Sequence, residues 1–595
     1  MSYENRNLIP EAYKWDLSSI LAGDKAWEDL FEEVSAKAEQ YGKYVGKLAD
    51  PDLLFEYLEF DTAVNLDLER LYVYAKMKKD EDGSQAKYAG MTDRAVGLLT
   101  RLSAASSFAL PEISALSEKT LRGLSDQPRF AAYRRMFGKI IRERAHILSA
   151  PEEKLLSLSG EISASFRSIF DSLDNVDMTF EEVEDEHGTS LPLSHGSYSV
   201  FLQSPDQGTR RRAFETYYKS YEGVIHTLAS IYTASVKKDC FYKTARGFES
   251  CMASALFSEE VDVAVYRNLL DAVNKGLPAL HEYMALRKKV ARLKELHMYD
   301  MHFPLFKGAE LKLDFEEAFA LVKEGLKPMG EEYAALLQRA HDERWMDVYE
   351  NKGKRTGAYS WGCYKSHPYV LLNHEKTTHS VFTIAHELGH AMHSYYSNTS
   401  LPPQTADYTI FVAEVASTVN EVLLLKHILS TTQDNKMKKF LLSYYLDMFR
   451  TTFFRQTQFS EFEALAHEMA EQGKPLTVES LSKVYGDLNR KYYGPACTYD
   501  KAIEYEWARI PHFYTAFYVY KYATGITSAV SIARGILSQG EKAVEQYKKF
   551  LRSGGSADPV SLLKIAGVDL STPVPFETAI AEFSDTLAEL KALTE

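Results

Sequence analysis

The segment that decides the architecture is residues 381–396, Val-Phe-Thr-Ile-Ala-His-Glu-Leu-Gly-His-Ala-Met-His-Ser-Tyr-Tyr. Its apolar residues recur every three or four positions, which is the period of an amphipathic helix. Thr377 or Thr378 can cap the start of such a helix, and the pattern ends near Ser397-Asn398. We therefore predict one long helix here.

Two histidines in this helix, His386 and His390, are four residues apart, so their imidazoles lie on one face about a turn apart and can reach one metal ion. Glu387, rotated by about 100° from His386, can address a water molecule at that ion. A catalytic zinc site has nitrogen and oxygen ligands and one open position, so it needs one more protein ligand. A chance match in a chain with 17 histidines is the alternative, and the helical context disfavours it.

The third ligand is expected to be Glu414. It stands in a second predicted helix, residues 410–421, among apolar neighbours, where a carboxylate is costly to bury unless it is paired or binds a metal. Cys363 is the alternative, as a soft ligand, although a cysteine on a strand is more often a small buried residue. His393 is seven residues from His386, about 10 Å along the axis, so we expect a supporting or structural role.

Glu421 lies two turns beyond Glu414 on the same face of the second predicted helix. Its carboxylate either holds a ligand histidine through the second ring nitrogen or lies on the surface, and the sequence favours neither reading.

The composition places these helices in a large acidic protein. The chain has 595 residues, more than one hydrophobic core accommodates, so we expect several lobes. Helical periodicity dominates and proline is sparse at 19, which predicts a mainly α fold. Acidic residues outnumber basic ones by 83 to 69, which argues against nucleic-acid and anionic-membrane partners.

Two departures from helical periodicity predict short β structure. Residues 344–373 alternate and contain the turn signal Asn351-Lys352-Gly353, so we predict a small antiparallel sheet beside the zinc-binding helix. Its edge is expected either to pair with a substrate backbone, with Gly357, Ala358 and Tyr359 as binding residues, or to form a covering hairpin.

The other departure, residues 176–204, predicts hairpin strands at 177–180 and 199–202. It suggests a boundary between an N-terminal helical lobe, residues 1–190, and a catalytic region, residues 191–595.

The compartment is predicted to be reducing and cytoplasmic. Four cysteines are too few and too scattered for a disulfide framework. The first residues have no apolar run like that of a signal peptide, and no run of about 18 apolar residues occurs elsewhere.

A tyrosine-rich run follows Pro511 and contains His512, Tyr514, Tyr518 and Tyr520. If the run is helical, Tyr514 and Tyr518 stack on one face. Such a stripe is more often packing than catalytic machinery. Nevertheless, hydroxyl groups of this kind can donate hydrogen bonds to a developing negative oxygen.

The motifs together resemble oligoendopeptidase F, in the thimet oligopeptidase clan of zinc peptidases. The likeness rests on residues 357–359, 367–373, 382–396 and 411–421, and it extends to weaker signatures at 13–17 and 299–305. The resemblance implies a helical ellipsoid divided by a deep channel, which admits short peptides.

The same resemblance implies zinc bound by His386, His390 and Glu414, with Glu387 as the base that hydrolyses internal peptide bonds. Because the clan has a histidine and tyrosines in a corresponding C-terminal segment, it also favours catalytic roles for His512 and Tyr518, and more weakly for Tyr514 and Tyr520.

Two rival readings remain at this stage. A zinc hydrolase of another amide, such as a deformylase, would favour Cys363 over Glu414 as the ligand. A binding protein with a structural zinc would have four protein ligands rich in cysteine, and no fourth ligand is evident.

Overall fold

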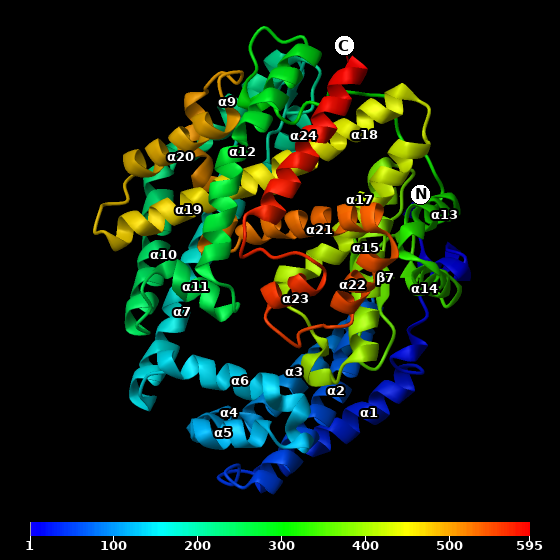
Figure 1. The fold of residues 1–595 in the computed structure, drawn as a ribbon, viewed down its shortest axis with the longest axis vertical. Helices are drawn as coiled ribbons and strands as arrows, with labels where there is room; N and C mark the ends of the chain where they lie inside the picture. Colours follow the sequence, from blue (N-terminus) through cyan, green and yellow to red (C-terminus); the bar gives the residue numbers. More distant parts are fainter. Residues whose placement is uncertain (1, 595) are drawn as a thin grey trace. The chain divides into compact units, whose positions relative to one another are not determined.

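The computed structural model describes residues 2–594, and most of them are helical, as the sequence predicts (Figure 1). The contacts divide the chain into two compact units. The first comprises Met1–Ala145, Glu310–Ser430 and Ile532–Val568, and the second comprises His146–Ala309, Thr431–Ser531 and Asp569–Glu595. The predicted boundary at residue 190 does not coincide with any boundary between the two units. The division into an N-terminal lobe and a catalytic region therefore stays a prediction.

The first unit contains the predicted zinc-binding helix and the small sheet. Its helices are α1 (Asp24–Lys37), α2 (Pro51–Glu81), α3 (Ala86–Ser106), α4 (Ala109–Ala115), α5 (Glu118–Ser125), α6 (Arg134–Glu143), α13 (Phe315–Gly325), α14 (Glu331–Asp342), α15 (Thr378–Ser400), α16 (Pro403–Ala406), α17 (Ile410–Thr431), α22 (Glu541–Leu551) and α23 (Pro559–Ile565). Its strands are β1 (Ser2–Tyr3), β4 (Met346–Asp347), β5 (Glu350–Asn351), β6 (Tyr359–Trp361) and β7 (Tyr369–Leu371).

The second unit contains the tyrosine-rich run. Its helices are α7 (Ala150–Ser172), α8 (His195–Phe201), α9 (Gln207–Gly223), α10 (Ile225–Ala245), α11 (Cys251–Ser258), α12 (Val263–Val290), α18 (Asn435–Met448), α19 (Arg455–Glu471), α20 (Val478–Tyr493) and α24 (Val574–Thr594). A hairpin of β2 (Val183–Glu184) and β3 (Ser190–Leu191) belongs to it, and α21 (Tyr520–Gln539) begins in this unit and ends in the other.

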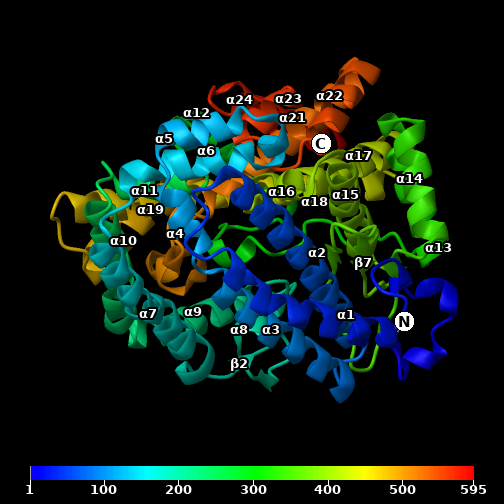
Figure 2. The ribbon, with the colours of Figure 1, turned by 90° about the horizontal axis from the view of Figure 1, so that it is seen from below.

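The sheet next to α15 is mixed, so the prediction of an antiparallel sheet is wrong in part. Strand β7 lies between β4 and β6, parallel to β4 and antiparallel to β6. More than twenty residues separate β4 from β7, which is enough chain for the crossover that a parallel pair needs. Strands β6 and β7 both contact α15, as predicted, and Figures 1 and 2 show α15, α17 and β7 side by side.

The predicted strands at 177–180 and 199–202 are misplaced. The antiparallel hairpin lies between them, with Val183 opposite Leu191 and Gly188 in its turn at φ 77°. Ser194 begins a helix instead, because its side chain accepts a hydrogen bond from the Ser197 amide and its own amide donates to Oγ of Ser197. This capping box outweighs the local alternation of apolar residues.

Candidate metal centre

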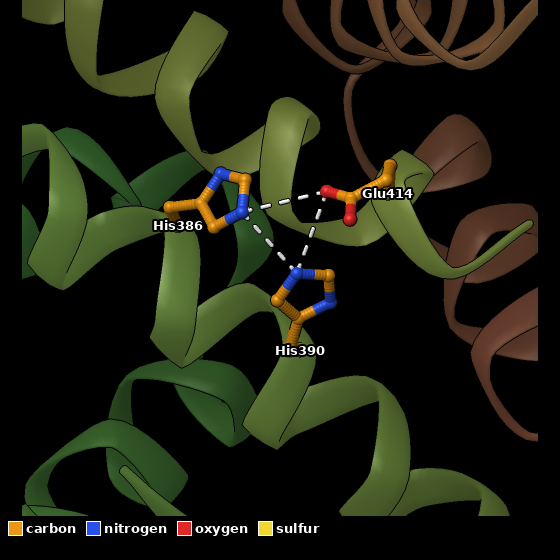
Figure 3. Close-up of side chains that lie close together, drawn as sticks. All are labelled: His386, His390 and Glu414. Carbon is orange, nitrogen blue, oxygen red and sulfur yellow. Dashed lines mark hydrogen bonds and ion pairs between the residues drawn. The ribbon is translucent and has the colours of Figure 1, made fainter. Parts of the chain in front are cut away.

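Helix α15 begins where the sequence predicts. The side chain of Thr377 accepts a hydrogen bond from the amide of Ser380, which caps the helix. The helix continues to Ser400, slightly beyond its predicted end. One face of it is buried in the first unit, and His386 and His390 point from the edge of that face toward α17 (Figure 3).

Helices α15 and α17 approach each other closely at Gly389. A Cβ atom at this position would lie 2.6 Å from the carbonyl oxygen of Ala416 and 2.6 Å from the Cα of Ser417, so any larger residue would force the backbones apart. The buried side chain of Asn420 forms a hydrogen bond between the two helices, because its Nδ2 donates to the carbonyl of Ala385 at 3.0 Å. Glycine between the histidines is therefore what lets the two helices share a site.

Three predicted ligands converge between these helices (Figure 3). The Nε2 atoms of His386 and His390 are 3.2 Å apart, and Oε2 of Glu414 lies 3.4 Å from the first and 3.5 Å from the second. Ligands at about 2.0–2.1 Å from a tetrahedral zinc ion are separated by about 3.3 Å. The spacing of the three side chains thus fits a zinc ion. This is the one such group of His, Cys, Asp or Glu within residues 2–594.

The carboxylate of Glu414 is more accessible than its apolar neighbours suggest, with 44% of its side chain exposed. Hydrogen bonds from His386 and then His390 lower the pKa of Glu414 well below its usual range. It is therefore ionised at neutral pH, which is the state a metal ligand needs.

Glu421 lies behind His386. Its Oε1 is 2.5 Å from Nδ1 of that ring, so the geometry supports the first of the two predicted alternatives for this residue. Burial lowers the pKa of His386, but hydrogen bonds to Glu414 and Glu421 outweigh it and raise the pKa to about 10. The contact fixes Nδ1 as the donor and turns Nε2 toward Glu414.

Glu387 is buried, with 7% of its surface exposed. Burial raises its pKa, and Glu414 and Glu421 raise it further, whereas His386 and His390 oppose the shift. A carboxylate with a raised pKa beside a metal site is suited to accept and return a proton.

The two other candidate ligands lie elsewhere. Cys363 is buried and its Sγ is 3.3 Å from Oγ of Ser366, outside the three-residue group. His393 is fully buried, and its ring stacks on Tyr408 at a centroid distance of 3.7 Å. Burial lowers the pKa of His393 to about 3, so it is a neutral packing residue.

A cavity of about 620 Å³ in the first unit continues the face of α15 that carries the histidines. Ser394 and Asn398 line it, and they lie four and eight residues further along the helix than His390. Ser360 and Trp361 of β6 form part of another wall. The cavity therefore borders both α15, beyond His390, and strand β6.

Strand β6 is an edge strand, and Ser360 is its outward-facing residue. The amides of Val370 and Leu372 bond to the strand on the far side of β7, so Tyr359 and Trp361 share the hydrogen bonds with β7. The backbone N–H and C=O of Ser360 therefore point away from β7. Sequence reasoning missed Ser360, because its direction depends on the register with β7.

The three predicted substrate-binding residues precede or begin this strand. Gly357 is exposed, with φ 81° and open space where a Cβ would lie. Its carbonyl accepts a hydrogen bond from Nδ2 of Asn373 at 2.8 Å. Ala358 is partly exposed, and Tyr359 turns its hydroxyl to Oδ2 of Asp80 at 3.0 Å. Their role in binding a substrate stays a prediction.

The run after Pro511 is not a continuous helix, so the condition for stacking Tyr514 and Tyr518 on one helical face is not met. A 3-10 turn, Pro511–Tyr514, is followed by a loop in which Phe517 has the left-handed φ of 55°, and α21 begins only at Tyr520. The amide of Phe517 donates to the buried carboxyl of Glu463 at 3.0 Å, which holds the loop. Local periodicity carries no sign of this tertiary contact.

The loop brings His512 and Tyr518 together without a helix. Their rings stack with centroids 6.0 Å apart. Tyr522, which sequence reasoning did not select, completes the group, because its hydroxyl is 3.3 Å from Nε2 of His512. Burial lowers the pKa of His512, and Arg167 and Arg455 lower it further.

The other two predicted tyrosines are packed. Tyr514 stacks on Phe170 at a centroid distance of 4.6 Å. Tyr520 is fully buried, and its hydroxyl donates to Oε2 of Glu259 at 3.1 Å. Burial raises the pKa of both hydroxyl groups.

A helical fold with two histidines and a glutamate around one metal-sized gap defines a candidate metallohydrolase, and comparison with known proteins identifies its class. The family model described as "Peptidase family M3" matches residues 200–582, and that described as "Oligopeptidase F" matches residues 112–180. The chain belongs to peptidase family M3 and is a metalloendopeptidase. The family excludes the deformylase and binding-protein readings.

Relatives resemble the chain over nearly its full length. Oligopeptidase PepF of Bacillus subtilis (strain 168) is 42% identical over 99% of this chain and 88% of its own. The crystal structure of oligoendopeptidase-F from Enterococcus faecium is 36% identical, with a TM-score of 0.73 over 96% of this chain and 99% of its own. A protein from Chlamydophila abortus is 35% identical, with a TM-score of 0.96 over 100% of both chains.

Within residues 2–594, none of the helices combines the length and the apolar character that crossing a bilayer requires.

Proposed function

We propose that the chain is a zinc-dependent endopeptidase that hydrolyses internal bonds of short oligopeptides, with Glu387 as general base. The observation that carries the proposal is the triangle formed by His386, His390 and Glu414, with sides of 3.2 to 3.5 Å. These three residues would hold one zinc ion per chain. When bound, zinc supplies a Lewis acid that polarises the scissile carbonyl and makes a water molecule more acidic.

Glu387 takes the proton of the attacking water and delivers it to the leaving amine. Its place next to His386 in α15 supports this role, and so does the rise in its pKa caused by burial, because a carboxyl group with a raised pKa holds the accepted proton better before delivering it. Glu421 orients the His386 ring through Nδ1.

We assign stabilisation of the developing oxyanion to the His512 and Tyr518 pair, with Tyr522 added by its hydrogen bond to His512. A buried donor aimed at an oxyanion is typically worth about 3 kcal/mol. Tyr514 and Tyr520 are better suited to support this segment than to contact substrate, because one ring is stacked and the other hydroxyl is engaged by Glu259.

A substrate backbone is proposed to add to the edge of β6 at Ser360, with Gly357 and Ala358 leaving room for it. Strand addition holds a peptide in extended form without reading its side chains. The adjoining cavity of about 620 Å³ offers space for side chains of a short peptide.

The catalytic region is proposed to be residues 191–595, since every assigned residue lies there. We also propose that the protein works in the cytoplasm. All four cysteines are free thiols, which suits a reducing compartment.

Replacing Glu387 by Gln tests the assigned base. The variant is expected to bind one zinc ion per chain and to cleave a fluorogenic oligopeptide about 10²–10⁴-fold more slowly. Glu375→Gln, an exposed residue before the same helix, is the matched control and should cleave normally. Zinc bound in full together with undiminished cleavage by Glu387→Gln would refute the assignment.

A further inference from the structure

Two cysteines of the second unit meet where the chain passes from α10 to α11 (Figure 1). Sγ of Cys251 lies 3.6 Å from Sγ of Cys240, although the two residues are 11 positions apart in the chain. The other two cysteines have different neighbours, because Sγ of Cys363 contacts a serine hydroxyl and Sγ of Cys497 contacts a methionine sulfur. Cys240 and Cys251 are therefore the pair in which one thiol can react with another.

Helix caps hold the backbone on both sides of this corner. Helix α10 ends at Ala245, and Gly247 follows with a φ of 71°, the left-handed conformation that commonly ends a helix. Helix α11 starts after Ser250, whose side chain accepts a hydrogen bond from the amide of Ala253. These caps restrict the chain between the two helices, so the two sulfur atoms stay close together.

The two thiols differ in their access to solvent. Cys240 is partly exposed, whereas Cys251 is buried, with 3% of its surface exposed. An oxidant dissolved in water therefore reaches Sγ of Cys240 first. Cys251 is reached through its neighbour, which is the arrangement of a reacting thiol beside a resolving thiol.

The surroundings favour a thiolate at Cys240. The thiol of Cys251 donates a hydrogen bond to Sγ of Cys240, and this bond is the main cause that lowers the pKa of Cys240 to about 7. Burial opposes the shift, His467 adds to it, and Glu471 and Asp239 oppose it. Burial also lowers the pKa of His467, but the hydrogen bond to Asp239 at 3.3 Å helps to raise it overall. A positively charged imidazole is thus available near the sulfur that has to ionise.

Glu471 keeps the proton on Cys251. Its Oε1 accepts a hydrogen bond from the backbone amide of Cys251 at 2.5 Å, in the first turn of α11. This carboxylate offsets the positive end of the helix, which would otherwise stabilise a thiolate. The hydrogen bond to Cys240, then burial, and then Glu471 raise the pKa of Cys251. Cys251 therefore remains a thiol where Cys240 can ionise.

We propose that Cys240 and Cys251 are a site of reversible oxidation, which forms an intramolecular disulfide when the protein meets hydrogen peroxide. The thiolate of Cys240 attacks one peroxide oxygen, so an S–O bond forms, the O–O bond breaks and hydroxide leaves. The thiol of Cys251 then attacks that sulfur, so the S–S bond forms, the S–O bond breaks, and the thiol proton leaves with the hydroxyl group as water. The two sulfur atoms lose two electrons, and the peroxide gains them.

The disulfide would stabilise the segment at which the chain enters the second unit. Nη1 of Arg246, in the connection between α10 and α11, donates to the carbonyl of His146 at 2.9 Å and pairs with Glu153. The ring of Phe248 stacks on that of His146 at a centroid distance of 3.7 Å. A covalent link between residues 240 and 251 closes a short loop around these contacts, so the corner should open less often.

The direct test treats the reduced full-length protein with a small excess of hydrogen peroxide. After alkylation of the remaining thiols and digestion with trypsin without reductant, we expect residues 239–243 and 247–267 in one disulfide-linked peptide, which dithiothreitol separates. The thiols titrated in denaturant should decrease from four to two. Oxidation without this linked peptide, or a disulfide between two chains, would overturn the proposal. The site uses none of the metal-binding residues, so this result is independent of the proposed peptidase mechanism.

Two variants separate the roles of the two cysteines. In Cys251→Ala the sulfenic acid on Cys240 has no resolving thiol, so peroxide should yield a dimedone adduct at Cys240. In Cys240→Ala the buried Cys251 should form at least about tenfold less adduct. The matched control is Cys497→Ala, which removes a partly exposed thiol of the same unit and should still form the linked peptide. Equal dimedone labelling of the first two variants would contradict the assigned order of attack.

Hydrogen exchange measures the effect on the corner. Backbone amides of residues 246–250 are expected to exchange at least about tenfold more slowly in the oxidised protein than in the reduced protein. The difference should vanish in Cys251→Ala, which cannot form the disulfide. Equal exchange in the oxidised and reduced wild type would show that the disulfide does not stabilise this corner.

Discussion

The carboxylate of Glu421 lies 2.5 Å from Nδ1 of His386, on the opposite side of the ring from Glu414. This contact makes the imidazole a preoriented ligand, since it fixes both the tautomer and the direction of Nε2.

Replacing Glu421 by Leu is therefore expected to weaken zinc binding about 10–100-fold. Glu421→Gln should have a smaller effect, because its amide oxygen still accepts from Nδ1 but carries no charge. The measurement is a competition between the protein and a chromogenic chelator. Wild-type zinc affinity in the Leu variant would show that Glu421 does not support the ligand.

Gly389 is expected to be essential for zinc binding and stability, because it lies against the backbone of α17. In Gly389→Ala the new methyl group would meet backbone atoms of α17 at 2.6 Å, so Glu414 is displaced from the histidines. We expect lost zinc affinity and a decrease in unfolding free energy of about 1–3 kcal/mol.

Gly535→Ala is the matched control for this substitution. Its Cβ would have an ordinary contact at 3.8 Å, so the change should leave zinc binding intact. Equal zinc affinity in the two alanine variants would contradict the close-approach argument.

Ser360→Pro tests strand addition at the edge of β6. Proline removes an N–H that points away from β7, so the sheet should persist, whereas a substrate backbone loses one hydrogen bond. We expect KM for oligopeptides to rise several-fold, in line with about 1 kcal/mol for such a bond, with little change in kcat. An unchanged KM, with the fold verified by circular dichroism, would exclude this docking mode.

Glu463 gives a prediction about pH and stability. Burial raises its pKa to about 8, and Asp239 adds to the shift, while His467 and the Phe517 amide oppose it. The folded state therefore holds a proton that the unfolded state releases near pH 4.5. Between pH 5 and pH 8 the wild type should lose up to about 1.4 kcal/mol of unfolding free energy per pH unit from this group.

Glu463→Gln does not titrate and should keep the hydrogen bond from the Phe517 amide. Near pH 5 its Tm should match that of the wild type. Between pH 5 and pH 8 its Tm should exceed the wild-type Tm by a growing margin, and above pH 8 this margin should stay constant. Glu468→Gln, exposed on the same helix, serves as the control. A Tm difference that does not vary with pH would show that Glu463 is ionised in the folded protein.

The sequence was sufficient to predict that His386, His390 and Glu414 lie together, because the spacing of the two histidines is local. His386 and His390 are related by one helical turn, and an acid in a small-residue helix singled out Glu414. The mainly α fold and the helix cap at Thr377 follow from the same short-range rules. The close approach of α15 and α17 at Gly389 explains why α17 can bring Glu414 to the two histidines. This approach depends on helix packing and could not be predicted from the sequence.

Features that depend on distant contacts were not predictable in this way. The parallel pairing of β4 with β7 follows from a crossover, and the direction of Ser360 follows from that register. The chain forms a loop at Phe517, where the carboxyl of Glu463, from a separate helix, accepts a hydrogen bond from the Phe517 amide. For the same reason Tyr522, and not Tyr514, joins His512.

The most direct test of the account is anomalous diffraction at the zinc edge from crystals of the purified protein. The account predicts a single strong peak per chain, about 2.0–2.2 Å from the Nε2 atoms of His386 and His390 and from a carboxylate oxygen of Glu414. A peak elsewhere, a fourth protein ligand in place of solvent, or Glu414 turned away from the ion would contradict it.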